Sequence, residues 1–147
     1  MFGFMLFLHF SGLFVWLGAL LAIVVVLSAG KRQQGSSELR TLGMRLIKIF
    51  QGLGHSGAVA VLASGVVMIV SMDLGKNKPL WLEVMEKGGG TLILLALVVL
   101  GIMGSRLTKK LAEGGQAGNS HASRYITIVS AFIILIAGVM LAVSIKI

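Results

Sequence analysis

The chain has 147 residues, of which 56% are hydrophobic and only 12% are charged, so a soluble domain of this composition would expose a large apolar surface. Lipid is therefore the expected solvent. The 13 basic and 5 acidic residues give a net charge of +8, but they stand between apolar segments, which favours a membrane surface over nucleic acid as their partner. The absence of cysteine excludes disulfides, thiolate metal sites, iron–sulfur clusters and cysteine nucleophiles.

Four apolar segments are long enough, or nearly long enough, to cross a membrane. A spanning helix needs roughly 20 residues, because a rise of about 1.5 Å per residue must cover a hydrocarbon core of about 30 Å. The segments cover residues 2–29, 49–72, 89–104 and 125–145, and the third is short unless it borrows the turn that holds Lys87, which extends it to 87–104. The first lacks a basic n-region and is too long for a signal peptide, so we expect it to be retained. The sequence thus predicts an all-α fold, a single transmembrane domain over residues 1–147 built as a four-helix bundle.

The loop charges predict the direction of the spans. The first and third loops are strongly basic, whereas the second balances its lysines with acidic residues. Because basic residues in short loops stay on the cytoplasmic side, both termini are expected to be extracytoplasmic in a multi-pass protein of the cell membrane, most simply a bacterial inner or plasma membrane. The basic loops would then face the anionic cytoplasmic leaflet. A homodimer or a larger membrane complex is left open. The basic residues of these two loops are Lys31, Arg32, Arg40, Arg45, Lys48, Arg106, Lys109, Lys110 and Arg124.

Two segments outside the spans also have informative patterns. Residues 41–51 carry Leu42, Leu46 and Ile49 at helical spacing, which predicts that the second helix begins below the membrane. Residues 114–120, GGQAGNS, predict a flexible turn before the fourth span.

Ionisable residues within the spans are the candidates for chemistry, because such groups are costly in hydrocarbon unless they are paired or used. His9 lies about 10 Å below the outer end of the first span, and Gly12 and Trp16 share its helical face. The glycine leaves room for a flat ligand, and neutral imidazole is a good axial ligand for haem iron. The alternative is a histidine that is hydrogen-bonded to a neighbouring helix. Trp16 lies deep in the span, so packing is its expected role.

His55 is flanked by Gly54, Ser56 and Gly57, which would make a polar notch suited to a haem edge, a buried water or a helix crossing. By residue count it lies roughly 15 Å deeper than His9. Two imidazoles on one iron must lie near one level, so a shared haem is disfavoured. Two separate sites, or one metal site and one structural histidine, are expected.

Lys87 lies at the outer level, as His9 does. It could anchor the third span by snorkelling, hold a haem propionate or an anionic substrate, or pair with Glu83 or Glu86. His121 is expected at the cytoplasmic surface. The eight methionines do not cluster in the sequence, so most of them are expected to serve packing rather than Cu(I) binding.

The stretch from His9 to Leu20, with a tryptophan seven residues after the histidine, resembles helix one of the haem-dependent membrane protoporphyrinogen oxidases and their relatives in the copper-resistance protein D superfamily. Residues 44–49 resemble the basic start of their second helix, and Lys87 after Trp81 and Leu82 resembles their lysine-bearing third helix. The resemblance implies a four-helix bundle in which His9 ligates haem b and Lys87 is a second functional group.

The chain departs from the oxidase pattern at two places. The oxidase has Asn-Glu and a proline early in helix four, where this chain reads Val129-Ser130-Ala131-Phe132, and a proline in helix two, where this chain has Gly54-His55. The missing carboxylate argues against porphyrinogen oxidation. The sequence therefore predicts a small haem b membrane protein for electron transfer or for haem and porphyrin handling, with an oxidoreductase activity left open. A non-enzymatic accessory or copper-transport subunit and a porphyrinogen oxidase are the alternatives.

Overall fold

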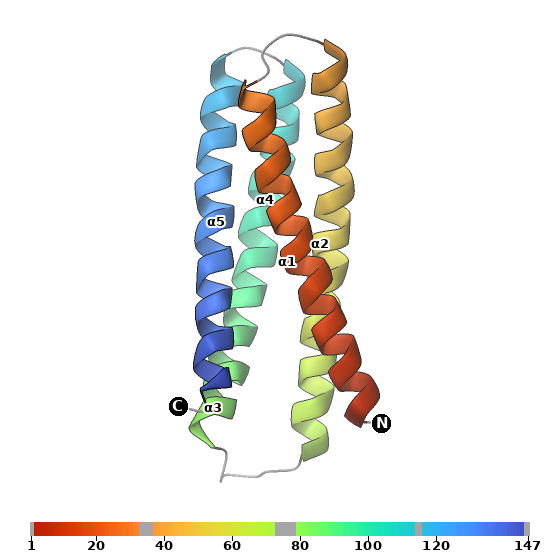
Figure 1. Cartoon of the computed structure of the whole chain (residues 1–147), viewed down its shortest axis with the longest axis vertical. Helices are drawn as coiled ribbons and strands as arrows, with labels where there is room; N and C mark the ends of the chain where they lie inside the picture. Colours follow the sequence, from red (N-terminus) through yellow and green to blue (C-terminus); the bar gives the residue numbers. More distant parts are fainter. Residues whose placement is uncertain (1, 33–36, 73–78, 114–115, 146–147) are drawn as a thin grey trace.

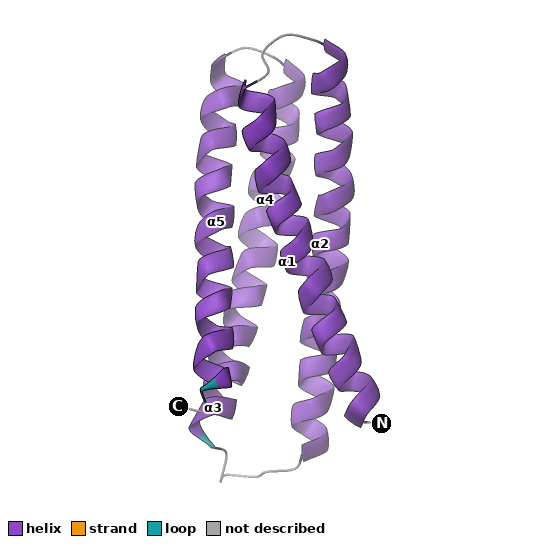
Figure 2. Cartoon of the chain, in the orientation of Figure 1, coloured by secondary structure: helices purple, strands orange, loops and turns teal. Residues whose placement is uncertain are grey.

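The computed structural model describes residues 2–32, 37–72, 79–113 and 116–145, without the side chains of residues 31–32, 37–40, 81, 113 and 116–119. Within these ranges all the secondary-structure elements are helices (Figure 2). They are α1 (Phe2–Arg32), α2 (Ser37–Met72), α3 (Leu80–Glu83), a π-helical segment η1 (Val84–Gly89), α4 (Gly90–Glu113) and α5 (Gln116–Ser144). α3, η1 and α4 follow one another without a break. The all-α prediction is confirmed, whereas the Trp81 side chain and the loop residues 73–78 lie outside the description.

The four long helices form an up-down-up-down bundle (Figure 1). α1 packs most extensively on α2 and also contacts α5, while α4 contacts α2 and α5, so α1 and α4 occupy opposite corners. Short connections between long helices favour this antiparallel order. The ends of α1 and α4 therefore meet the starts of α2 and α5 at one end of the bundle. Phe2 and Ser144 lie at the other end, as expected for termini that share one side of a membrane.

The outer surface of the bundle is apolar. Four helical stretches are long and apolar enough to cross a membrane: Phe2–Gly30, Thr41–Met72, Val84–Ala112 and Ser120–Ser144. Only 17–33% of their most apolar windows is buried in the bundle, and large side chains such as Phe14, Val70 and Ile134 point outward. An apolar surface of this extent is what a multi-pass membrane protein presents to lipid.

Two helix bounds bear on the predictions made outside the spans. α2 begins at Ser37, so residues 41–51 are helical as predicted. α5 begins at Gln116, so the prediction of a turn over residues 114–120 is wrong for residues 116–120. Helical hydrogen bonding at the start of a long helix outweighs the low propensity of Gly118 there. His121 consequently lies within α5, where it is exposed.

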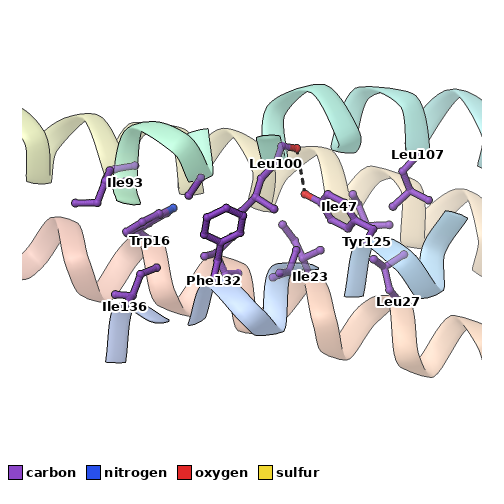
Figure 3. Packing of buried hydrophobic residues seen from close by; sticks show 14 of the residues in the cluster. Trp16, Ile23, Leu27, Ile47, Ile93, Leu100, Leu107, Tyr125, Phe132 and Ile136 are labelled. Atoms are coloured by element: carbon purple, nitrogen blue, oxygen red, sulfur yellow. Dashed lines mark hydrogen bonds between the residues drawn. The ribbon is translucent and has the colours of Figure 1, made fainter. Parts of the chain in front are cut away.

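The main apolar cluster fills the middle of the bundle and extends toward the basic loops, while Met68 and Leu82 are buried apart from it, nearer the end that holds the termini. Trp16, Ile93 and Ile136 form the outer layer of this cluster, and Leu107 lies near the opposite end (Figure 3). Farther out, residues 2–10 of α1 are exposed or half-buried. His9 therefore lies beside the end of the main apolar cluster and is half-buried.

The orientation of the bundle can be tested with single cysteines, because the natural chain has none. Leu80 and Ser120 are both exposed and lie at opposite ends. If the basic loops are cytoplasmic, L80C will react with an impermeant maleimide in cells whose inner membrane is intact, and S120C will react only after that membrane is opened. The reverse labelling pattern would contradict extracytoplasmic termini.

Candidate functional site

The site around His9 begins with a close crossing of α1 and α2. A Cβ atom added to Gly12 would lie 2.9 Å from the Gly57 carbonyl oxygen and 2.9 Å from Val61 Cγ2, and one added to Gly57 would lie 2.9 Å from the Gly12 oxygen. Glycine at both positions lets the two backbones touch, which is how many membrane helices associate. The room beside Gly12, which the sequence suggested for a flat ligand, is filled by α2.

His9 lies one helical turn outward from this crossing, and its ring is held by α2. Nδ1 is 3.0 Å from the Val61 carbonyl oxygen and 3.2 Å from Ser64 Oγ, while the Ser64 hydroxyl donates to the Ala60 carbonyl at 2.6 Å. Because a carbonyl oxygen can only accept, we assign the ring proton to Nδ1, which donates to Val61. In the neutral ring, Nε2 then carries the free lone pair.

The remaining contacts of His9 are apolar. A Cβ on Gly65 would lie 3.4 Å from His9 Cε1, so the imidazole lies over a position without a side chain. The Phe10 ring stands edge-on to it, with centroids 6.4 Å apart. Within the described residues Nε2 makes no hydrogen bond, and the side chain is half-buried. The ring is thus oriented through one nitrogen while the other is left free.

His55 has a different environment. Its Nδ1–H donates to the Gln51 carbonyl in its own helix at 2.8 Å, and Nε2 lies 3.1 Å from the position of a Cβ on Gly101 in α4. His9 contacts residues 61–65 of α2, six to ten residues beyond His55, or about 9–15 Å at the helical rise. The structure does not bring the two imidazoles together.

The residues around His55 do not form one notch, because consecutive residues of a helix point in different directions. Gly54 and Gly57 face Trp16 of α1, whereas the exposed Ser56 hydroxyl donates to the Leu53 carbonyl at 2.9 Å. Of the three uses considered for this segment, the helix crossing is the one that Gly57 serves. Trp16 is 2% exposed, in keeping with the packing role expected for it.

Lys87 lies in η1 and forms an ion pair within its own helix. Its Nζ donates to Glu83 Oε1 at 2.7 Å, and both side chains are exposed. Of the roles considered for Lys87, the structure therefore contains the ion pair with Glu83. Among the described contacts none joins Lys87 to His9.

A multi-ligand metal centre is not found in the described part of the chain, where no three or more His, Asp or Glu side chains gather. Haem iron needs only one or two protein ligands, which a single oriented histidine can begin to supply. Gln51 and Tyr125, two polar side chains that are not among the predicted site residues, meet at the centre of the bundle. The sequence does contain a signal for Gln51, because an amide side chain within an apolar span often forms hydrogen bonds to a neighbouring helix.

Comparison with protein-family models, with curated proteins and with solved structures finds no significant match to this chain. The resemblance to the copper-resistance protein D superfamily stays a prediction. The assignment of function accordingly depends on the geometry around His9.

The helix crossing predicts opposite effects for two glycines of α1. Gly12→Ala places a methyl group against α2 and should cost about 1–3 kcal/mol of stability, as overpacking does. Gly18→Ala meets nothing within 4 Å and should be neutral or stabilising by ~0.5–1 kcal/mol. Thermal unfolding in detergent, followed by circular dichroism, measures both. Equal melting temperatures for the two variants would contradict the close crossing.

Proposed function

We propose that this protein is a small integral membrane protein that binds haem b through Nε2 of His9 and takes part in electron transfer or in haem or porphyrin handling. The observation that carries the proposal is the hydrogen bond from His9 Nδ1 to the Val61 carbonyl, which leaves Nε2 as the free nitrogen. Histidines that ligate metals almost always donate their other ring N–H to a carbonyl or carboxylate.

The donor chemistry around His9 fits a haem ligand. Val61 and Ser64 hold the ring and would make Nε2 more basic, and Gly65 lets the ring lie close against α2. When bound, haem iron supplies a one-electron redox couple. The chain's own residues would orient the ligand and surround it with apolar side chains that keep water away.

The location of His9 supports an electron-transfer role. His9 lies near the start of α1, toward the end of the bundle that holds the termini and beyond the main apolar cluster. A cofactor held there would lie near one membrane face, within reach of a redox partner at that face. Lys87 would have to leave Glu83 to bind a haem propionate, so the proposal assigns it no role.

His55 is not part of the proposed site. Its Nε2 lies against Gly101 of α4, and a haem on that nitrogen would overlap α4. One axial ligand from this chain is therefore proposed.

An absorption spectrum tests the proposal. Protein purified from haem-supplied cells should show a Soret band, which His9→Ala should remove without unfolding the protein, because iron then loses its ligand. His55→Ala is the matched control and should keep the band. Size-exclusion profiles and circular dichroism verify that both variants are folded. A colourless wild-type protein, or a Soret band that survives in the His9 variant, would overturn the proposal, and stoichiometric copper without haem would favour the transport alternative.

A milder change probes how His9 is held. Ser64→Ala removes one of the two contacts of Nδ1 and keeps the bond to Val61, so haem should remain bound at about tenfold lower affinity, as for other outer-shell partners of metal ligands. Ser71→Ala is the control, since that hydroxyl donates only to the Val67 carbonyl of its own helix. The measurement is the rate of haem loss to an excess of a haem-scavenging protein. Equal rates for the two variants would show that Ser64 does not support the ligand.

A further inference from the structure

A small cavity lies at the centre of the bundle, inward of His9. Its volume is about 20 Å³, which is enough for one water molecule. All four long helices line it, and most of the lining is apolar. Three polar residues, Gln51, His55 and Tyr125, form its other wall. Such a cavity holds water only where two or more polar groups can bind it.

The Gln51 amide supplies the first of these groups. Its Nε2 is buried, and among the described residues it has no hydrogen-bond partner. A buried N–H donor without an acceptor is costly in an apolar interior. The Tyr125 hydroxyl lies beside the amide, but among the described residues no acceptor meets hydrogen-bond geometry with Nε2, so a small bridging molecule would satisfy it.

The Tyr125 hydroxyl supplies the second group. A Cβ on Gly104 would lie 3.2 Å from the Tyr125 hydroxyl oxygen and 2.9 Å from Gln51 Cδ, so the two side chains meet at this glycine. The hydroxyl donates to the Leu100 carbonyl across a long 3.4 Å (Figure 3). Its oxygen can still accept a hydrogen bond.

His55 supplies the third group at the rim of the cavity. The side chain is exposed on its other side, and its Nδ1–H is engaged by the Gln51 carbonyl, so Nε2 is an acceptor in the neutral ring. Gln51 and His55 are one turn apart on α2, and the glycines they approach, Gly104 and Gly101, are one turn apart on α4. The glycines of α4 make the space for the polar pair of α2.

We propose that this cavity binds one ordered water molecule, which accepts a hydrogen bond from Gln51 Nε2 and donates to the Tyr125 hydroxyl and toward His55. The water would satisfy the buried amide and connect an exposed histidine with the centre of the bundle. This site is separate from the His9 site and does not depend on haem binding.

Radiolytic hydroxyl-radical labelling of the folded protein in detergent tests the proposal. Radicals formed from a bound water react with adjacent side chains even when a scavenger removes radicals from bulk water. Tyr125 is 1% exposed, so we expect its labelling to persist with a scavenger present, while that of the exposed His121 falls. Scavenger-sensitive or undetectable labelling of Tyr125 in the wild-type protein would overturn the proposal.

The variant Gln51→Leu keeps a side chain of similar size, removes the donor and adds no group that competes strongly for radicals. It should lower the scavenger-resistant labelling of Tyr125 about fivefold, the loss of occupancy that one missing hydrogen bond produces. Ala96→Val, which narrows the cavity from the α4 side and keeps all three polar groups, should lower it as well. Unchanged labelling of Tyr125 in the folded variants would count against a water held by Gln51.

Discussion

The contact between the backbones of Gly12 and Gly57 is the constraint on which the rest of the structure depends. Because α1 and α2 touch there without side chains between them, the crossing sets the register of the two helices. That register places His9 against Val61 one turn outward and Trp16 against Gly54 one turn inward. In a bilayer, lipid would give these helices no hydrophobic reason to associate, and close packing of this kind would supply the stability.

Polar groups in the bundle are accommodated at two levels by different means. At the outer level, the backbone and hydroxyl of α2 satisfy one nitrogen of His9 and leave the other free. At the level of the central cavity, two glycines of α4 make room for Gln51 and His55, and the buried Gln51 amide nitrogen lacks a well-formed hydrogen bond. An oriented but incompletely satisfied group in an apolar surrounding is where a ligand or a solvent molecule can bind.

Much of the fold was predictable from the sequence, because hydropathy and span length report directly on helices that cross a membrane. The burial of Trp16 also followed from its depth in a span. The contact of Gly12 with α2 could not be predicted. A sequence shows which residues share one face of a helix, but it does not show which neighbouring helix that face meets. The Gln51 and Tyr125 pair was missed because neither residue is charged at neutral pH and they come from helices far apart in the chain. The start of α5 differs from the prediction because small residues favour turns in isolation, whereas here they begin a long helix.

The sequence separation of the contacts has a consequence for the order of assembly. Every described contact of His9 comes from α1 and α2, which are consecutive in the chain. A hairpin of these two helices can form in the bilayer during synthesis, before α4 and α5 have been inserted. The His9 environment would then be complete in a half-made protein, whereas the central cavity, lined by all four long helices, can exist only after the second hairpin has docked.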